Sequence, residues 1–406
     1  MLPDFSWEAA FILRKVLFIV VLLPLLGAAG WWYFREQPLP DYGPAYREYA
    51  YVSNGRSNTV SVIDLRTFQL AKTIPVGISP TGIAANRKKN EIYIVNSGSN
   101  NVSVIDAEKN AVVATIGVHG RPYFIDVAED GKRAYVANSG SANVSVIDLE
   151  SREVLGNVRV GSAPGIARVS PDGATVVVSN RDDDTVSLVD AKLLRVRATL
   201  PVCQYPEDIA ILPDSSKAFV ACSGSSQVAS IALAGNRNGQ PVGDRVLALL
   251  DVGRTPVNLA LKPDGGEMMV CDFDSDSISI VETANDEVGS SVLIGQHPAH
   301  GLVTLDNSRL YVSNFGSDSV AVYDIELGRR IATMAVGSHP DGLALSQDQR
   351  YLLVLDTQAG DVTVIQKRTA RKLEPTEYSL LTMIPVGLQP NGIAVKAFMV
   401  TGPKTK

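Results

Sequence analysis

The sequence predicts an all-β fold, a closed ring of eight four-stranded sheets preceded by one transmembrane helix, and three observations predict it. A pattern that reads approximately YVxN, turn, VSVID, turn, IxVG, then Pro and GIA recurs along the chain at a step of 42 residues, with a single step of 50. Each repeat holds four short apolar runs, which is typical of a radial β-array, the β-propeller. An uncharged stretch of 19 residues precedes the first repeat.

Two independent sets of positions give the number of blades. The residues that end the YVxN runs are Asn54, Asn96, Asn138, Asn180, Cys222, Asp272, Asn314 and Asp356. The prolines that follow the IxVG runs are Pro80, Pro122, Pro164, Pro206, Pro256, Pro298, Pro340 and Pro390. Both sets predict eight blades.

Residues 91–126 illustrate one repeat. The run EIYIV ends at Asn96, which closes the next turn, and Val102 to Asp106 form the following strand. Both faces of that strand are largely apolar, as expected of a sheet packed between two neighbours. AVVATIG is the outer strand, and the innermost strand follows Pro122, because proline is tolerated at the start of a strand.

The two ends of the repeat array are expected to pair. The array opens at a YVxN strand, Tyr51 to Asn54, and its last strand is an innermost one, Asn391 to Val395. If these strands stayed apart, each would leave an open edge that invites aggregation. We therefore expect the C-terminal strand to close the ring by joining the N-terminal blade.

The N-terminal region is interpreted as a membrane anchor. Residues 16–34 carry no charge and span about 28 Å as a helix, close to the hydrocarbon thickness of a bilayer. Arg14 and Lys15 favour a cytoplasmic N-terminus, and Trp31, Trp32 and Tyr33 suit an outer interface. A cleaved signal peptide is the alternative. The expected organisation is a cytoplasmic or interfacial segment (1–15), the anchor (16–34), a proline-rich tether (35–47), the propeller (48–397) and a tail (398–406).

The strings YVSNGRSNTVSVID, YIVNSGSNNVSVID, YVANSGSANVSVID and YVSNFGSDSVAVYD resemble the YVTN-repeat β-propeller family of YncE-like and surface-layer type. This resemblance covers nearly all of residues 50–396 and implies an extracytoplasmic or surface-associated propeller. Many members have seven blades, so seven is the alternative count. Eight blades are similar to the haem d1 domain of cytochrome cd1 nitrite reductases, a more distant resemblance.

Composition excludes several functional classes. The net charge of −6 and the absence of a basic stripe argue against nucleic-acid binding. The three cysteines, Cys203, Cys222 and Cys271, form no CxxC or CxxCH motif and no disulfide framework is expected. No G-x-S-x-G, HExxH or P-loop motif is present, so the chain is not expected to be an enzyme.

The candidate ligand site lies at the mouth of the central channel. All four histidines fall in connections between an outer strand and the next innermost strand, where propellers usually bind ligands. The polar residues predicted to line the mouth are Asp208, Asn258, His297, His300 and His339. They suit a haem-like tetrapyrrole or a transition metal, and the alternative is a set of solvated polar residues without a ligand.

Two other features depart from the repeat. The turns Arg181 to Asp184 and Asp272 to Asp276 are rich in carboxylates and are weak calcium candidates, because the full ligand pattern is missing. Two insertions, 234–245 and 367–378, extend hairpins on the opposite face, where they are plausible partner contacts. The hairpin residues predicted to meet a partner are Asn236, Arg237, Arg245, Lys367, Arg368, Arg371 and Lys372.

These features favour a membrane-anchored, extracytoplasmic propeller that acts as a non-enzymatic scaffold or accessory subunit of a membrane-protein complex. Its partners would be membrane lipid, through the N-terminal helix, and a protein of that complex. The first alternative is a propeller that binds a tetrapyrrole or a metal for electron transfer or cofactor assembly. A lactonase-type hydrolase is less favoured, because only Asp208 occupies a channel position that its acidic metal ligands would need.

Overall fold

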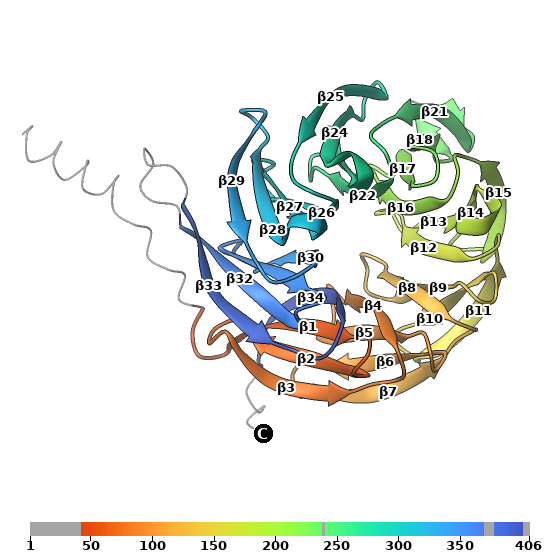
Figure 1. The fold of residues 1–406 in the computed structure, drawn as a ribbon. Helices are drawn as coiled ribbons and strands as arrows, with labels where there is room; N and C mark the ends of the chain where they lie inside the picture. Colours follow the sequence, from red (N-terminus) through yellow and green to blue (C-terminus); the bar gives the residue numbers. More distant parts are fainter. Residues whose placement is uncertain (1–41, 238–239, 369–376, 401–406) are drawn as a thin grey trace, which may run out of the picture. The chain divides into compact units, whose positions relative to one another are not determined.

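The structure is a computed structural model and describes residues 42–237, 240–368 and 377–400. The chain divides into two units, Met1–Pro44 with Lys367–Glu377, and Ala45–Gln366 with Tyr378–Lys406. The second unit is the propeller (Figure 1). The expected transmembrane helix at 16–34 lies outside the described residues. Among the helices that are described, none has the length and apolar character needed to cross a membrane.

Eight four-stranded antiparallel sheets form the blades, which confirms the predicted fold and blade number. The innermost strands are β34 (Pro390–Met399), β4 (Pro80–Ala85), β8 (Pro122–Val127), β12 (Pro164–Val169), β16 (Pro206–Ile211), β22 (Pro256–Leu261), β26 (Pro298–Val303) and β30 (Pro340–Leu345). The second strands are β1 (Tyr46–Asn54), β5 (Glu91–Asn96), β9 (Arg133–Asn138), β13 (Thr175–Asn180), β17 (Lys217–Cys222), β23 (Glu267–Asp272), β27 (Arg309–Asn314) and β31 (Tyr351–Asp356). In both series the strands are given in the order of blades 1 to 8.

The outer half of each blade completes the set. The third strands of blades 1 to 8 are β2 (Thr59–Asp64), β6 (Asn101–Asp106), β10 (Asn143–Asp148), β14 (Thr185–Asp190), β18 (Gln227–Ala232), β24 (Ser277–Glu282), β28 (Ser319–Asp324) and β32 (Asp361–Arg368). The outer strands are β3 (Gln69–Pro75), β7 (Ala111–Gly117), β11 (Glu153–Arg159), β15 (Arg195–Pro201), β21 (Arg245–Asp251), β25 (Glu287–Leu293), β29 (Arg329–Ala335) and β33 (Glu377–Pro385). Short 3₁₀ turns are η1 (Arg181–Asp183), η2 (Phe273–Ser275) and η3 (Phe315–Ser317).

The ring closes where the two ends of the array meet. Strand β34 pairs with β1, with Tyr51 opposite Ala394, so blade 1 has the order β3-β2-β1-β34 and the predicted closure is confirmed (Figure 1). The seam is reinforced beyond the sheet, because the buried Lys396 donates from Nζ to the Asn86 carbonyl of blade 2 at 2.6 Å.

The apolar core is divided into eight clusters, one between each pair of neighbouring blades. In the cluster between blades 1 and 2, Tyr51 and Val62 pack against Ile92 and Ile105, all fully buried. The second and third strands are therefore covered on both faces, which explains why the VSVID runs lack a polar face.

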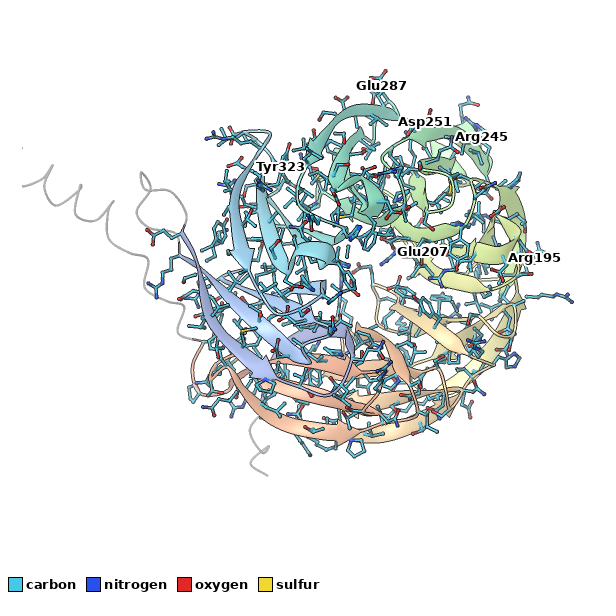
Figure 2. All side chains as sticks on the ribbon, in the orientation of Figure 1. Arg195, Glu207, Arg245, Asp251, Glu287 and Tyr323 are labelled. Carbon is cyan, nitrogen blue, oxygen red and sulfur yellow. A yellow bond between two sulfur atoms is a disulfide. The ribbon has the colours of Figure 1, made fainter. Side chains whose placement is uncertain are left out.

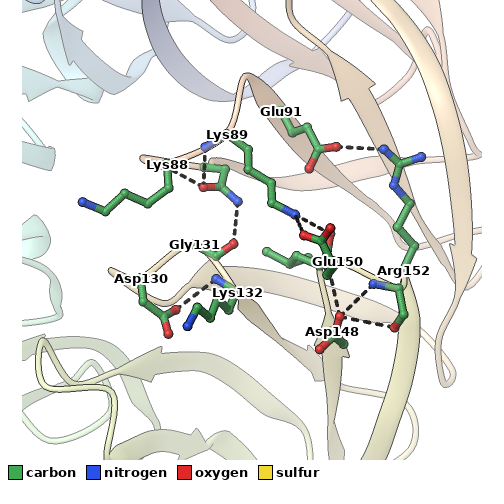
Figure 3. Close-up of polar contacts among 12 residues, drawn as sticks. Lys88, Lys89, Glu91, Asp130, Gly131, Lys132, Asp148, Glu150 and Arg152 are labelled. Carbon is green, nitrogen blue, oxygen red and sulfur yellow. Dashed lines mark hydrogen bonds and ion pairs between the residues drawn. The ribbon is translucent and has the colours of Figure 1, made fainter.

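Polar contacts join neighbouring blades on the face that carries the turns between third and outer strands (Figure 3). Lys89 of blade 2 reaches Glu150 of blade 3 at 2.7 Å, and Arg152 of blade 3 pairs with Glu91 of blade 2 at 2.8 Å. The Asp of VSVID closes its own turn, as Asp148 Oδ1 accepts from the Glu150 and Ser151 N–H groups. The two ion pairs link blade 2 to blade 3.

Candidate functional site

The connections from outer to innermost strands and the turns between second and third strands lie on one face, named here the loop face. The main chain shows this directly, because the Ser97 N–H donates to the Ser79 carbonyl at 3.0 Å and the Phe315 N–H donates to that of His297 at 2.9 Å. Turns between third and outer strands meet the connections from innermost to second strands on the opposite face, as the Ala107 N–H bond to Asn90 shows.

Carboxylates of one blade hold the pre-proline residue of the next blade. His297 and His339 both have positive φ, +49° and +55°. The His297 N–H donates to Asp276 at 2.9 Å, and the His339 N–H donates to Asp318 at 2.8 Å. These two hydrogen bonds stabilise the left-handed backbone conformation, which residues other than glycine adopt only at a cost in free energy.

Four rings form a continuous row on the loop face of blades 6 to 8, named here the aromatic ladder. His297 stacks on Phe273 with ring centres 4.6 Å apart and planes 10° apart. Phe273 lies 6.1 Å from Phe315, and Phe315 meets His339 edge to face at 4.4 Å. The two phenylalanines were not among the residues singled out from the sequence, although each stands where three other blades have serine.

Asp208 and Asn258, two predicted ligand residues, are brought together at the inner rim of the ring. Asp208 Oδ2 accepts from Asn258 Nδ2 at 2.9 Å and from the Leu259 N–H at 3.0 Å, while its Oδ1 accepts from the Ile209 N–H. Asn258 Oδ1 accepts from the Gly301 N–H at 2.9 Å. These side chains therefore pair main-chain groups of the innermost strands, which have no fifth strand to pair with.

His300 lies apart from the aromatic ladder, on innermost strand β26. Its N–H donates to Ser313 Oγ at 3.1 Å. The nearby Asp341 carboxyl sits deep in the ring, so burial raises its pKa, and the charge of His300 counteracts this in part. The five predicted residues thus fall into two groups: Asp208, Asn258 and His300 at the inner rim, and His297 and His339 in the ladder.

Two aromatic–arginine–carboxylate stacks bridge blades 3, 4 and 5. Near the loop face, the Arg181 guanidinium lies 4.4 Å from the Tyr123 ring and 3.0 Å from Glu207, which Figure 2 places on the inner side of its blade. In the second stack, Arg168 lies over the Phe124 ring at 5.3 Å and approaches Asp208 at 3.4 Å.

Sequence reasoning named Arg181 only as part of a carboxylate-rich turn and did not single out Arg168. Arg168 stands at a position where five of the eight blades have alanine. A charged residue at a position that is usually alanine was the signal in the sequence.

A disulfide bond joins Cys203 to Cys222, which corrects the expectation of no disulfide, while Cys271 is free and buried. In six blades the position of Cys203 is glycine, and in all six the position of Cys222 is asparagine or aspartate with that glycine packed against it. In blade 4 the Gly161 N–H donates to Asn180 at 3.1 Å. Two cysteines that replace a contacting pair in a single repeat were the signal in the sequence.

The acidic turns are used by the fold. Asp183 and Asp184 accept from the N–H groups of Ser162 and Tyr205, and Asp276 holds His297 as described. Burial raises the pKa of Asp272 to about 6, and the hydrogen bond that its carboxylate accepts from Ser279 offsets this in part. Within residues 42–237, 240–368 and 377–400, no three His, Cys, Asp or Glu side chains are grouped to hold a metal ion.

The first predicted partner hairpin is present on the face opposite the loop face. Strands β19 (Gly235–Arg237) and β20 (Gln240–Val242) pair with each other, and Asn236 and Arg237 belong to β19. At its base, Asp244 accepts two bonds from Arg197, at 2.7 and 2.9 Å. Arg245 follows at the exposed start of β21 (Figure 2).

The second predicted hairpin is only partly described. Lys367 and Arg368 end β32, and the predicted contacts Arg371 and Lys372 lie outside the described residues. A partner for either hairpin stays a prediction.

Comparisons with known proteins agree with the fold. A family model described as YNCE-like beta-propeller matches residues 38–169 and 164–379. The Kuenenia stuttgartiensis hydrazine synthase superposes with a TM-score of 0.55 at 21% identity, over 68% of this chain and 91% of that chain. The dihydro-heme d1 dehydrogenase NirN in complex with DHE superposes with a TM-score of 0.68 at 16% identity, over 89% of this chain and 77% of that chain. A functionally unknown protein from Desulfotomaculum acetoxidans superposes with a TM-score of 0.58 at 15% identity, over 76% of this chain and 99% of that chain. No curated protein matches the sequence.

Proposed function

Because the chain belongs to the YNCE-like β-propeller family, we propose that it is a non-enzymatic, membrane-tethered binding module that docks a partner protein on its loop face. The observation that carries this proposal is the composition of that face. Aromatic and arginine side chains are the residues enriched at the centres of protein interfaces. The loop face carries the aromatic ladder and, in addition, the exposed Tyr123, Tyr205, Ile78 and Leu388.

The inner rim supports a binding role over a catalytic one. A general base or nucleophile needs a free lone pair within reach of the reacting atom. The Asp208 carboxylate instead accepts from two main-chain N–H groups, Asn258 and Arg168. A lactonase-type site at Asp208 would have to use a carboxylate that the fold already uses.

The extracytoplasmic location is part of the proposal. The Cys203–Cys222 bond supports it, because disulfides persist in oxidising compartments. The apolar stretch at 16–34 supports a tether, with the propeller on the outer side of the membrane. A short proline-rich segment after that stretch would keep the propeller near the bilayer, where subunits of a membrane complex are within reach.

Co-purification tests the binding function. The full-length chain is extracted from its native membrane in several mild detergents, and we expect one protein to accompany it in stoichiometric amounts in all of them. A monomer free of partners under every gentle condition would contradict a scaffold or accessory role.

A second candidate function is the binding of a flat tetrapyrrole at the loop face. The aromatic ladder favours it, because such rings stack on flat π-systems. The structural likeness to NirN, solved in complex with DHE, raises the same possibility at the level of the fold alone. The visible absorption spectrum of the chain purified from its own membrane decides between the two: a stoichiometric chromophore supports the second candidate, and a colourless complex with a partner protein supports the first.

A further inference from the structure

The aromatic ladder is surrounded by carboxylates and is poor in cations. Asp274 and Asp318 are exposed on either side of Phe273 and Phe315, and Asp276 lies between them. The connections and turns that form this sector are 252–255, 273–276, 294–297, 315–318, 336–339 and 357–360, and their only lysine or arginine is Arg254. Its guanidinium donates to the Asp274 carbonyl at 2.6 Å. The sector thus presents ring faces beside negative charge.

The loop face of blades 3 to 5 shows the same elements with a cation added. There Arg181 lies over the Tyr123 ring at 4.4 Å and pairs with Glu207 at 3.0 Å. Arg181 occupies the turn position that Phe273 and Phe315 occupy in blades 6 and 7. The sector of blades 3 to 5 therefore supplies ring, guanidinium and carboxylate from the chain itself. In the ladder sector, the guanidinium of Arg254 is bonded to a main-chain carbonyl.

We propose that the aromatic ladder and its carboxylates dock a segment rich in arginine or lysine from a partner protein. The proposal rests on the proposed function, partner docking through the loop face, and adds the chemistry of the docked segment. A cation above an aromatic face is attracted by the ring quadrupole, and flanking carboxylates add attraction and fix the register of the segment. The acidic, aromatic sector is complementary to such a segment and repels an acidic one.

Peptide binding to the full-length chain in detergent tests this chemistry. Fluorescence anisotropy is followed with labelled (Gly-Arg)₄, (Gly-Gln)₄ and (Gly-Glu)₄ peptides. We expect (Gly-Arg)₄ to bind, with an affinity that falls as salt is added, and the other two not to bind.

Phe273→Ser with Phe315→Ser should weaken (Gly-Arg)₄ binding by about five- to thirtyfold, as two exposed cation–π contacts imply. Serine is the residue of blades 2, 3 and 5 at this position, so the variant is expected to fold.

Two further variants test the role of charge in the ladder and the effect of a surface change elsewhere. Asp276→Asn with Asp318→Asn removes charge while keeping the acceptor for the next blade, as Asn58 and Asn100 do in blades 1 and 2, and should weaken binding by about two- to tenfold at low salt. Leu293→Ser changes an exposed apolar residue of outer strand β25, away from the loop face, and should leave the affinity unchanged.

Equal binding of all three peptides, or undiminished (Gly-Arg)₄ binding by the double-serine variant, would overturn the proposal. Self-association of the chain that the double-serine variant abolishes would also overturn it, because the occupant would then be a second copy. Co-purification keeps the two levels distinct. A partner that stays bound to the double-serine variant refutes the ladder as the docking site and leaves the scaffold function intact. If no partner co-purifies with the unaltered chain, both proposals are refuted.

Discussion

At the scale of single residues, Asp208 acts as a clamp between innermost strands. It accepts from Ile209 and Leu259 of two neighbouring blades and from the Asn258 side chain. Asp208→Ala would leave these donors without a partner, and unpaired buried donors cost about 1–3 kcal/mol each. We expect the free energy of unfolding to fall by about 2–4 kcal/mol, measured by urea denaturation. Asp208→Asn keeps one acceptor oxygen and should lose about half as much, and an unchanged urea midpoint in Asp208→Ala would contradict the clamp.

Blade 8 carries a second unusual pair of residues, Asp356 and Asp361. Burial, together with the facing Asp361 carboxyl, raises the pKa of Asp356 to about 8. An unfolded aspartate has a pKa of about 4. Asp356 therefore keeps its proton to a higher pH in the folded chain than in the unfolded chain. Its contribution to the free energy of unfolding is greatest below about pH 4 and falls as the pH rises towards 8.

Asp356→Asn tests this dependence, because asparagine stands at the same position in five other blades. We expect the variant to be more stable than the unaltered chain by about 1–3 kcal/mol at pH 8, with little difference at pH 4. Melting temperatures across this range measure it. If the variant were less stable than the unaltered chain at pH 8, ionisation of Asp356 would not destabilise the fold, and the prediction would be wrong.

At the scale of elements, the Cys203–Cys222 bond replaces a contact that other blades make with glycine and asparagine or aspartate. Closing a loop of this length stabilises by about 3 kcal/mol. Reduction, or Cys203→Ser with Cys222→Ser, should therefore lower the free energy of unfolding by about 2–4 kcal/mol. Cys203→Gly with Cys222→Asn rebuilds the contact of the other blades and should recover about half of the loss. Urea denaturation with and without reductant measures both, and equal stability of the reduced and oxidised chain would contradict the account.

The order of the strands was predictable from the sequence, because each blade repeats the same four short apolar runs and the same proline. The disulfide was harder to predict, since it depends on a contact between positions 19 residues apart that becomes visible only when the repeats are compared. The aromatic ladder depends on contacts between successive blades, such as Phe273 with His297, that a reading of one repeat does not contain. The roles of Asp208 and Asn258 were not predictable for the same reason, as their acceptors serve the next blade.

At the scale of the whole molecule, the ring depends on close approach of innermost strands. A Cβ on Gly82 of blade 2 would lie 3.0 Å from the Tyr123 carbonyl oxygen and 3.2 Å from the Phe124 Cα of blade 3, whereas a Cβ on Gly117 would meet nothing within 4 Å. Gly82→Ala should therefore cost about 1–3 kcal/mol, because main-chain atoms must shift, and Gly117→Ala should be close to neutral. Thermal unfolding compares the two, and equal melting temperatures would contradict tight packing at the inner rim.

The loop face is the surface that the whole account makes functional, and photo-crosslinking in the native membrane tests it most directly. A photoreactive phenylalanine analogue placed at Tyr205 or Phe315 on the loop face is compared with one at Leu293, an exposed residue of outer strand β25, and one at Arg245 on the opposite face. We predict one recurring adduct of defined mass from both loop-face positions and none from Leu293 or Arg245. Adducts from Arg245 alone, or none from the loop face, would contradict the account.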